Sequence, residues 1–559
     1  MKKLKLLIIP FILVLFILGT NSCVKDSFDF DRLSGEIHYE PSLAAPIAYS
    51  NLTMIDGLNA YDSVGRVQVN KDGFLSLFYF EHIESDTVSS LMDIGNQHVT
   101  SLTPAAGVDF TGFDNSGDVL TINRSVDFPF DLFNPEAELD SMWLDMGTLN
   151  LIATSTYEHG IELTITLPTF TKDGDPFSKT LNLLPYGSTA SSTDNSMIGY
   201  HIDLTQTALG YNEVPVEIQI RFVHSGGNNT GQLTLDVDLF NPDHEAMFGY
   251  FGYNTLIYES GKIDLDLFDP SDGWDLEDFW FEDPKFKVFY NNSYGIPTNF
   301  YFDSVTAFSS YYQQDYDILD YNAGLPMDSL APHYMSYPTV FGSSVDDSLI
   351  LDKDNSNISY VIQQRPAWIK FIAHAHTNPD GNIAGNNFVW DNSKYLADIE
   401  VELPLWGYID RFHGADTMDF NMEEEFEDPG VIERLLVRIN IDNGLPIFVE
   451  SQAYFMNENY MIIDSVIQAD DIRLIESATI DNDGQVISKT NKTIDLEITG
   501  ERLEKIMETK FLLYKASSST TNASNDEFIK IYPDYEVNFN VAIEADLDIN
   551  VNLDTLNND

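Results

Sequence analysis

The stretch YEVNFNVAIEADLDINVNL, from Tyr535 to Leu553, decides the fold class of this chain. Every second residue in it is apolar, and the residues between are mostly Glu, Asn and Asp. Successive side chains of a β-strand point to opposite faces, so this pattern predicts strands with one dry face and one wet face. A single strand of this length would exceed the usual range of about 3 to 10 residues. We therefore expect a bend, or a frayed end past Asp548.

The same alternation recurs in shorter runs, such as KIDLDLF at Lys262 to Phe268 and LDVDL at Leu235 to Leu239. Asp-Gly dipeptides, which favour hairpin turns, stand between β-patterned runs, for example at Asp173. A helical pattern occurs in GERLEKIMETKF, Gly500 to Phe511, with Thr499 placed to cap its N-terminus. The predicted fold class is all-β, with several β-sandwich-like modules in series and one short C-terminal helix.

One motif repeats along the chain, as FEDPKFKVFYNNSYGIP from Phe281 to Pro297 and as FEDPGVIERLLVRINIDNGLP from Phe426 to Pro446. Each copy has Asp-Pro, an apolar run, then Asn, Gly, an aliphatic residue and Pro. A looser copy begins at Phe133, so the phenylalanines are 148 and 145 residues apart. Proline cannot donate to a strand ladder and marks a strand start, and glycine accepts a positive φ at a turn. The near-constant period predicts repeated modules.

The repeat and the N-terminal pattern together divide the chain into consecutive parts. These are a signal peptide at 1–22, a lipidated tether at 23–35, an N-terminal β region at 36–125, and three β modules at 126–275, 276–420 and 421–559, the last with the short helix near 500–511. The three β modules have the lengths of ordinary single domains, about 100 to 200 residues.

The N-terminus has the layout of a secretory signal peptide, with lysines followed by an apolar run of 13 residues from Leu6 to Leu18. Cys23, the only cysteine, resembles the acylation site of bacterial lipoproteins, where the thiol carries a diacylglycerol. Lys25 and Asp26 behind it resemble the charged signal that exports lipoproteins of Bacteroidota to the outer face of the outer membrane. The alternatives are an ordinary cleaved signal and an ordinary polar tether.

Most of the chain is similar to large uncharacterised surface lipoproteins of Bacteroidota, through this anchor, GYFG at Gly249 to Gly252, and the NGLP run. A further pattern, Asp-[Ser/Thr] followed by an aliphatic residue, Ala, Met or Thr, occurs nine times, where residue frequencies would give roughly three. It resembles the O-glycosylation sequon of the same phylum, although Asp-Ser is also common in turns. The resemblance implies acceptors at Ser63, Thr87, Ser141, Ser304, Ser329, Ser348, Thr417, Ser465 and Thr555.

Charge limits the partners of this protein. The 29 basic and 89 acidic residues give a net charge of −60, and loss of the three lysines of the signal leaves 26 against 89, or −63. Such a field repels nucleic acid and anionic membrane surfaces, so nucleic-acid binding is excluded as a function. With 13% aromatic and 43% hydrophobic residues, the chain is too apolar to be disordered.

Three groups of residues could carry a binding site. His374 and His376 share one strand face at a spacing compatible with a metal, although no third ligand is evident and an exposed strand end explains them too. DPSDGWDLED at Asp269 to Asp278 and DKDNSN at Asp352 to Asn357 offer oxygens for a structural calcium ion, or are ordinary acidic turns. Aromatic residues could stack on a sugar, or belong to the core; they are Trp274, Trp280, Trp368, Tyr311 and Tyr312.

No Gly-x-Ser-x-Gly, His-Glu-x-x-His or phosphate-binding glycine-rich motif occurs in the sequence. We therefore predict a protein that is not an enzyme and has no dedicated metal or cofactor. It would act as an accessory subunit of an outer-membrane complex for transport, secretion or barrel assembly. Its partners would be an integral outer-membrane β-barrel protein and other lipoproteins. The alternatives are a stand-alone glycan-binding or adhesive protein and a carboxylate-based glycan hydrolase, which needs two acids about 5 to 9.5 Å apart.

Overall fold

The described part of the chain folds mainly into antiparallel sheets, as expected. This computed structural model describes residues 36–56, 66–84, 92, 94–205, 210–268, 274–320, 325–326, 332–383, 387–420, 431–468 and 472–552. The predicted all-β class is confirmed, and so is the short C-terminal helix, α6 (Gly500–Ile506). A further short helix, α4 (Ile358–Gln363), was not predicted. None of the helices in the described ranges has the length and hydropathy needed to span a bilayer.

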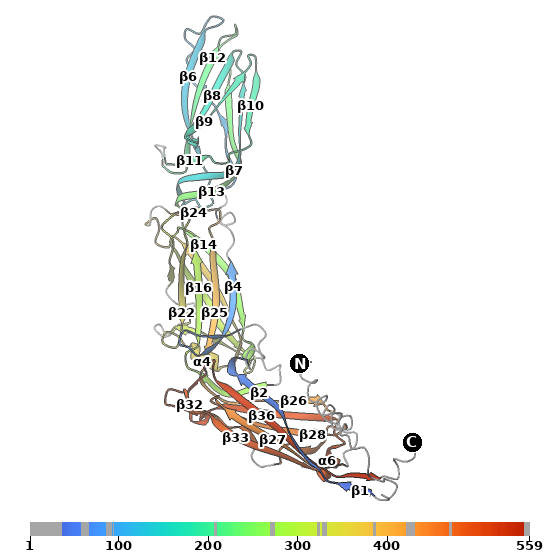
Figure 1. Ribbon diagram of the computed structural model, residues 1–559. Coiled ribbons are helices and arrows are strands. Elements are labelled where there is room, and N and C mark those ends of the chain that lie inside the picture. Colours follow the sequence, from blue (N-terminus) through green and yellow to red (C-terminus); the bar gives the residue numbers. More distant parts are fainter. Residues whose placement is uncertain are drawn as a thin grey trace.

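Three modules follow one another in an elongated molecule: two are stacked end to end, and the third lies at an angle to them (Figure 1). β6 (Val119–Pro129) and β12 (Glu213–Val223) lie in the module at one end, while β1 (Glu36–Tyr39) and α6 lie in the module at the other. These modules are termed distal, middle and C-terminal. β1 pairs with β37 (Ile549–Asn552), so both ends of the described chain meet at the end of the molecule opposite the distal module.

The distal module is one ten-stranded sheet in which the short β11 pairs with both β7 and β8 and joins its two halves. The halves enclose one core, in which the alternating Leu235, Val237 and Leu239 are each 0% exposed. Besides β6 and β12, its strands are β5 (Gln97–Leu102), β7 (Glu138–Ser155), β8 (Gly160–Lys172), β9 (Asp175–Leu183), β10 (Ser188–Asp194), β11 (His201–Asp203), β13 (Leu233–Tyr250) and β24 (Phe388–Trp390).

The middle module packs two five-stranded sheets against each other around a core that includes Phe286 and Phe371. One sheet has the order β22 (Val345–Leu351), β16 (Lys285–Asn292), β25 (Tyr395–Pro404), β4 (Leu75–Glu84) and β3 (Val67–Val69). The other has the order β14 (Asn254–Asp264), β23 (Pro366–Thr377), β17 (Thr298–Ser309) and β18 (Gln314–Asp317), with β21 (His333–Met335) also on β17. A small pair, β19 (Leu319–Asp320) and β20 (Leu325–Pro326), lies beside them.

The C-terminal module contains a four-stranded and a seven-stranded sheet. The first has the order β2 (Ser42–Thr53), β36 (Glu536–Leu547), β27 (Ile432–Asn443) and β33 (Thr490–Thr499). The second has the order β15 (Trp274–Phe281), β26 (Trp406–Asp419), β34 (Phe511–Thr520), β28 (Ile447–Met456) and β29 (Ile462–Ser465), with β30 (Arg473–Ile475) on β28 and β35 (Ile529–Lys530) on β26. β31 (Thr479–Ile480) and β32 (Val486–Ser488) form a separate pair.

The long C-terminal pattern does not form one continuous strand. β36 ends at Leu547, Asp548 is outside any strand, and β37 then joins a different, two-stranded sheet with β1. The run is therefore divided in two, in line with the expectation that it is too long for a single strand. The helix prediction is confirmed in detail as well, because the Thr499 hydroxyl accepts the backbone N–H of Arg502 and caps α6.

The N-terminal part of the chain does not form a region of its own, although 36–125 was expected to. β2 joins the C-terminal module, β3 and β4 join the middle module, and β5 joins the distal module. The chain therefore runs up the length of the molecule and returns. The modules are in series in space, but the sequence positions that build them are interleaved, because β-pairing connects strands regardless of their separation along the chain.

The repeated motif marks the same step in two modules. After its first copy the chain passes from β16 in one sheet of the middle module to β17 in the other. After its second copy it passes from β27 to β28, again between two sheets. In both copies the motif asparagine is buried and its side-chain oxygen accepts an N–H two residues later, Asn292 from Tyr294 at 2.8 Å and Asn443 from Leu445 at 2.9 Å.

The glycine of the motif has a different role from the one predicted. Neither Gly295 nor Gly444 has a positive φ. A Cβ on Gly295 would instead lie 2.4 Å from the ring of Phe388, where β24 crosses it. The turn needs a glycine because of this close approach and not because of its backbone conformation. The first proline, Pro284, directly precedes β16 as predicted, whereas Phe426 to Pro429 lie outside the described residues.

The joints between modules are packed with apolar side chains. At the distal joint, Tyr294 and Tyr395 of the middle module stack with ring centres 4.5 Å apart and belong to the distal core. At the other joint, Phe279 of β15 and Ile529 of β35 belong to the core of the middle module. Close-packed cores resist deformation, so we expect the joints to be stiff.

Candidate functional site

The sequence motif His374-Ala375-His376 lies on β23, the strand between β14 and β17 in the middle module. Residues two apart on a strand face the same side, and the two imidazole ring centres are 4.9 Å apart with their planes at 68°. Tyr301 of β17 stacks on His374 at 5.0 Å and 12°, and Tyr253, just before β14, stacks on His376 at 4.9 Å and 22°. This group is termed the imidazole–tyrosine cluster.

Two polar side chains hold the imidazoles of this cluster. Asp303 Oδ1 is 2.8 Å from His374 Nδ1, and Thr255 Oγ1 is 3.1 Å from His376 Nδ1. Burial lowers the pKa of His376, and the neighbouring His374 lowers it further. His376 is therefore neutral at neutral pH, when a ring nitrogen keeps a free lone pair.

The two histidines are evident from the sequence, but the residues that hydrogen-bond to them are not. Asp303 and Thr255 come from strands that are far from β23 in sequence, and only the pairing register brings them beside it, with Thr255 opposite His376 and Tyr301 opposite His374. No local pattern signals this. A register prediction for β14 and β17 would have been required.

The acidic loop at Asp352 to Asn357 is less suited to calcium than its sequence indicates. In Asp352 to Asn357, Asp352 Oδ1 accepts the backbone N–H of Asp354 at 2.9 Å, and Asn355 Oδ1 accepts that of Asp352 at 2.9 Å. These oxygens form a turn that leads into α4. Residues 269–273 of the other loop lie outside the described residues. In the described ranges, no group of three or more His, Cys, Asp or Glu side chains could hold a metal ion.

The aromatic residues proposed as a sugar platform are dispersed. Trp368 stacks on Phe308 at 5.2 Å, which covers one of its faces, and Trp280 donates its indole N–H to Glu282 at 3.2 Å. The side chain of Trp274 lies outside the described residues. Tyr311 and Tyr312 are the two that face solvent, at 50% and 49% exposure, in the turn between β17 and β18.

The distal end of the molecule offers a second exposed surface. The loop between β9 and β10 carries Leu184 and Tyr186, which are 71% and 65% exposed. Beneath it, Tyr157 and Phe222 pack with ring centres 5.1 Å apart, and Phe110 contacts both. Two exposed apolar side chains thus lie near an aromatic cluster in the distal module, the module farthest from the chain ends (Figure 1).

Several predicted site residues lie outside the described residues, so their placement stays a prediction. They are Cys23, Lys25, Asp26, Ser63, Thr87, Ser329 and Thr555. The other proposed glycan acceptors all lie in strands. Ser141, Ser304, Ser348 and Ser465 are half-buried, and Thr417 on β26 is exposed.

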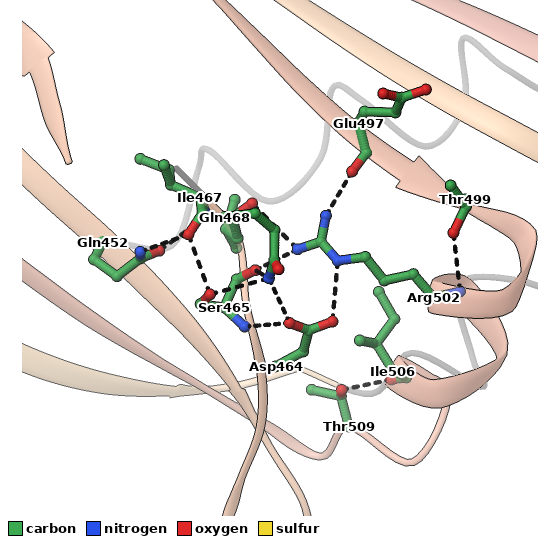
Figure 2. A network of polar contacts seen from close by, with 11 residues as sticks. Gln452, Asp464, Ser465, Ile467, Gln468, Glu497, Thr499, Arg502, Ile506 and Thr509 are labelled. Carbon is green, nitrogen blue, oxygen red and sulfur yellow. Dashed lines mark hydrogen bonds and ion pairs between the residues drawn. The ribbon is translucent and has the colours of Figure 1, made fainter. Parts of the chain in front are cut away.

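Ser465 belongs to a polar network between α6 and β29 (Figure 2). Its hydroxyl donates to the carbonyl of Ile467 at 3.1 Å and accepts from Gln468 at 3.2 Å. At the centre, Arg502 donates to Asp464 at 3.0 Å, to the carbonyl of Glu497 at 2.6 Å, and to the carbonyl of Ser465. Burial raises the pKa of Asp464, but the hydrogen bonds from Arg502 and from the backbone N–H of Ser465, together with the positive charges of Arg502 and Lys505, leave this pKa below its usual value.

No sequence model of a known family and no curated protein matches the chain. Among solved structures, a Parabacteroides distasonis protein provisionally described as secreted shares 11% identity, with 90% of this chain and 99% of that chain covered and a TM-score of 0.24. A protein of Sulfolobus Turreted Icosahedral Virus also shares 11% identity, with 89% and 96% covered and a TM-score of 0.12. TM-scores this low support no inference about fold or function.

Proposed function

We propose that this chain is a non-catalytic surface lipoprotein of a bacterium of the Bacteroidota, anchored in the outer membrane through acylated Cys23 and facing the cell exterior. It would serve as an accessory subunit of an outer-membrane complex, with an integral β-barrel protein and other lipoproteins as partners. The observation that carries the proposal is the elongated series of modules with both described chain ends at one end.

The length of the tether connects this shape to the anchor. Cys23 precedes β1 by 13 residues, which when fully extended reach about 45 Å. Lipidation there would keep the C-terminal module close to the leaflet, and the stiff joints would hold the distal module away from it. The most accessible surface would then be the distal end, where Leu184 and Tyr186 are exposed. Exposed apolar side chains of this kind favour contact with another protein.

A first experiment tests the anchor. Cells expressing the chain are labelled with radioactive palmitate, and Cys23→Ser is compared with the natural sequence. We expect label and membrane association in the natural chain and neither in the variant. Equal membrane association of the two would refute the anchor.

A second experiment tests the partner. Affinity purification in mild detergent should recover a stoichiometric integral membrane protein, and Leu184→Ser with Tyr186→Ser should reduce its recovery. Ile487→Ser, in the C-terminal module and also exposed at 64%, is the matched control and should change nothing. Clean recovery of the lipoprotein alone would refute the accessory role while leaving the anchor standing.

A glycan-binding surface protein is the second candidate, because Tyr311 and Tyr312 are both half exposed, with ring centres 4.9 Å apart and ring planes at 82°. The guanidinium of Arg365 lies 4.1 Å from the centre of the Tyr311 ring, so Tyr312 offers the more open face. Tyrosine faces are suited to stacking on sugar rings. Saturable binding on a glycan array, lost in a Tyr311→Ala, Tyr312→Ala double variant, would support this function. Binding that survives the double variant would argue against this site.

A further inference from the structure

We propose that His374 and His376 bind one late first-row transition-metal ion, of the class of Zn²⁺, Ni²⁺ or Cu²⁺, through their Nε2 atoms. The site lies on β23 in the middle module, and both imidazoles face the same side of the sheet. This inference does not depend on the lipid anchor or on a protein partner.

The hydrogen bonds of the two rings leave the correct nitrogen available. A carboxylate of an ionised aspartate can only accept, so Asp303 at 2.8 Å places the proton of His374 on Nδ1 and leaves the lone pair on Nε2. The Thr255 hydroxyl at 3.1 Å is able to accept from Nδ1 of His376 in the same way. Within the described residues, no hydrogen bond is assigned to either Nε2. A carboxylate behind a histidine is the usual support of a metal-binding imidazole, because it orients the ring and raises its basicity.

The separation of the rings fits a shared ion. A metal bound to Nε2 at about 2.0–2.1 Å lies about 3.2 Å from the ring centre. For bond angles at the metal between about 90° and 110°, two such ring centres are about 4.5 to 5.2 Å apart. The measured separation is 4.9 Å. This separation of the ring centres is compatible with one shared ion.

The tyrosines make this geometry rigid and argue against a different ligand. Tyr301 and Tyr253 stack almost flat against the two imidazoles, at 12° and 22°, so these ring faces are covered. A sugar needs an open aromatic face. In each stacked pair, the imidazole and the tyrosine cover one face of each other, so these two faces are closed to a sugar. Rings held in place by stacking lose less entropy when a metal binds, which favours preorganised ligation.

Two protein ligands leave at least two positions for water or for a group from a second molecule. Imidazole ligands suit Zn²⁺, Ni²⁺ and Cu²⁺, and Cu²⁺ should bind most tightly by the general order of divalent affinities. Ca²⁺ and Mg²⁺ prefer oxygen ligands and should not bind at this site.

The test uses the full mature chain carrying Cys23→Ser, which removes the single thiol as a competing ligand. Isothermal titration with Cu²⁺, Ni²⁺ and Zn²⁺ should show a site of one ion per chain, and Mg²⁺ should show none. His374→Ala and His376→Ala should each abolish it, and Asp303→Asn should weaken it by about 10- to 100-fold. His82→Ala is the matched control, because His82 is also held by a carboxylate, Asp398 at 2.6 Å, and should leave the site intact.

Two further readouts keep the proposal falsifiable if a variant folds poorly. With both histidines in place, the electron paramagnetic resonance spectrum of bound Cu²⁺ should show coupling to two nitrogens. Bound Zn²⁺ should protect His374 and His376 from modification by diethylpyrocarbonate, as measured by mass spectrometry. Absence of a one-ion site, or a site that survives both histidine substitutions, would overturn the proposal. Equal protection of His82 would overturn it too, because the ion would then bind histidines without selection.

Discussion

Replacing Arg502 by alanine should destabilise the C-terminal module strongly. The guanidinium lies between α6 and β29 and donates to the Asp464 carboxylate and to the carbonyl groups of Glu497 and Ser465 (Figure 2). The side chains of Arg502 and Asp464 are 12% and 9% exposed, so little solvent would replace the lost partner. An unpaired carboxylate in such a place is unfavourable.

The expected loss of stability follows from the burial of this ion pair. Removing one member of a buried ion pair costs about 3–5 kcal/mol, and for a unit of 150–250 residues each kcal/mol lowers Tm by about 2–4 °C. We therefore expect Tm to fall by roughly 6 to 20 °C. Arg438 is the matched control. It pairs with Asp495 through two hydrogen bonds of 2.7 Å, but the side chains are 51% and 43% exposed, so Arg438→Ala should cause little change.

The assay is differential scanning calorimetry, with the affected transition assigned by hydrogen exchange of the segment that contains α6. Arg502→Lys should be intermediate, because a lysine keeps the charge but cannot donate to several acceptors at once. The reasoning fails if Arg502→Ala lowers Tm no more than Arg438→Ala. It also fails if hydrogen exchange places the loss of protection in the middle or distal module.

Gly295→Ala should cost about 1–3 kcal/mol in urea unfolding because the new Cβ would lie 2.4 Å from a buried phenylalanine ring. Gly95→Ala, where a Cβ meets nothing within 4 Å, should be neutral, and an equal loss in both would contradict the overlap. A hydrogen bond from a neighbouring lysine, with two asparagine amides, lowers the pKa of Glu536 to about 2. Its contribution to stability is therefore full above the ordinary carboxyl pKa of about 4.3 and is lost as pH falls towards 2. Glu536→Gln should destabilise the protein near neutral pH and much less at about pH 2, and a loss independent of pH would refute this. If the native host adds glycans, peptide mass spectrometry should find them on exposed Thr417 and not on Ser465, whose hydroxyl is engaged in the polar network.

Features that depend on residues close together in the sequence could be predicted from the sequence. Alternation of apolar and acidic residues places side chains on two faces whatever the strand pairs with, which is why the buried face of β13 was predicted correctly. The Thr499 cap depends on a contact three residues away and was also correct. The glycine of the repeated motif was misinterpreted, because a ring from β24 and not the backbone angle requires it.

The candidate metal site also combines a feature that is evident in the sequence with one that only the structure shows. The spacing of His374 and His376 is a property of one strand and is evident in the sequence. The carboxylate that orients His374 is not evident in the sequence, because Asp303 reaches His374 from the neighbouring β17 through a register with a bulge.

Residue alternation and the Thr499 cap were enough to predict that the chain is built of strands with one apolar face and where the helix begins. Only the tertiary structure decided which strands pair, that Ser42 lies opposite Asp546, and that three modules share an interleaved chain. The physical reason is that side-chain alternation is an interaction between near neighbours. Strand pairing instead satisfies backbone groups across any distance in sequence, and many alternative pairings have the same local pattern.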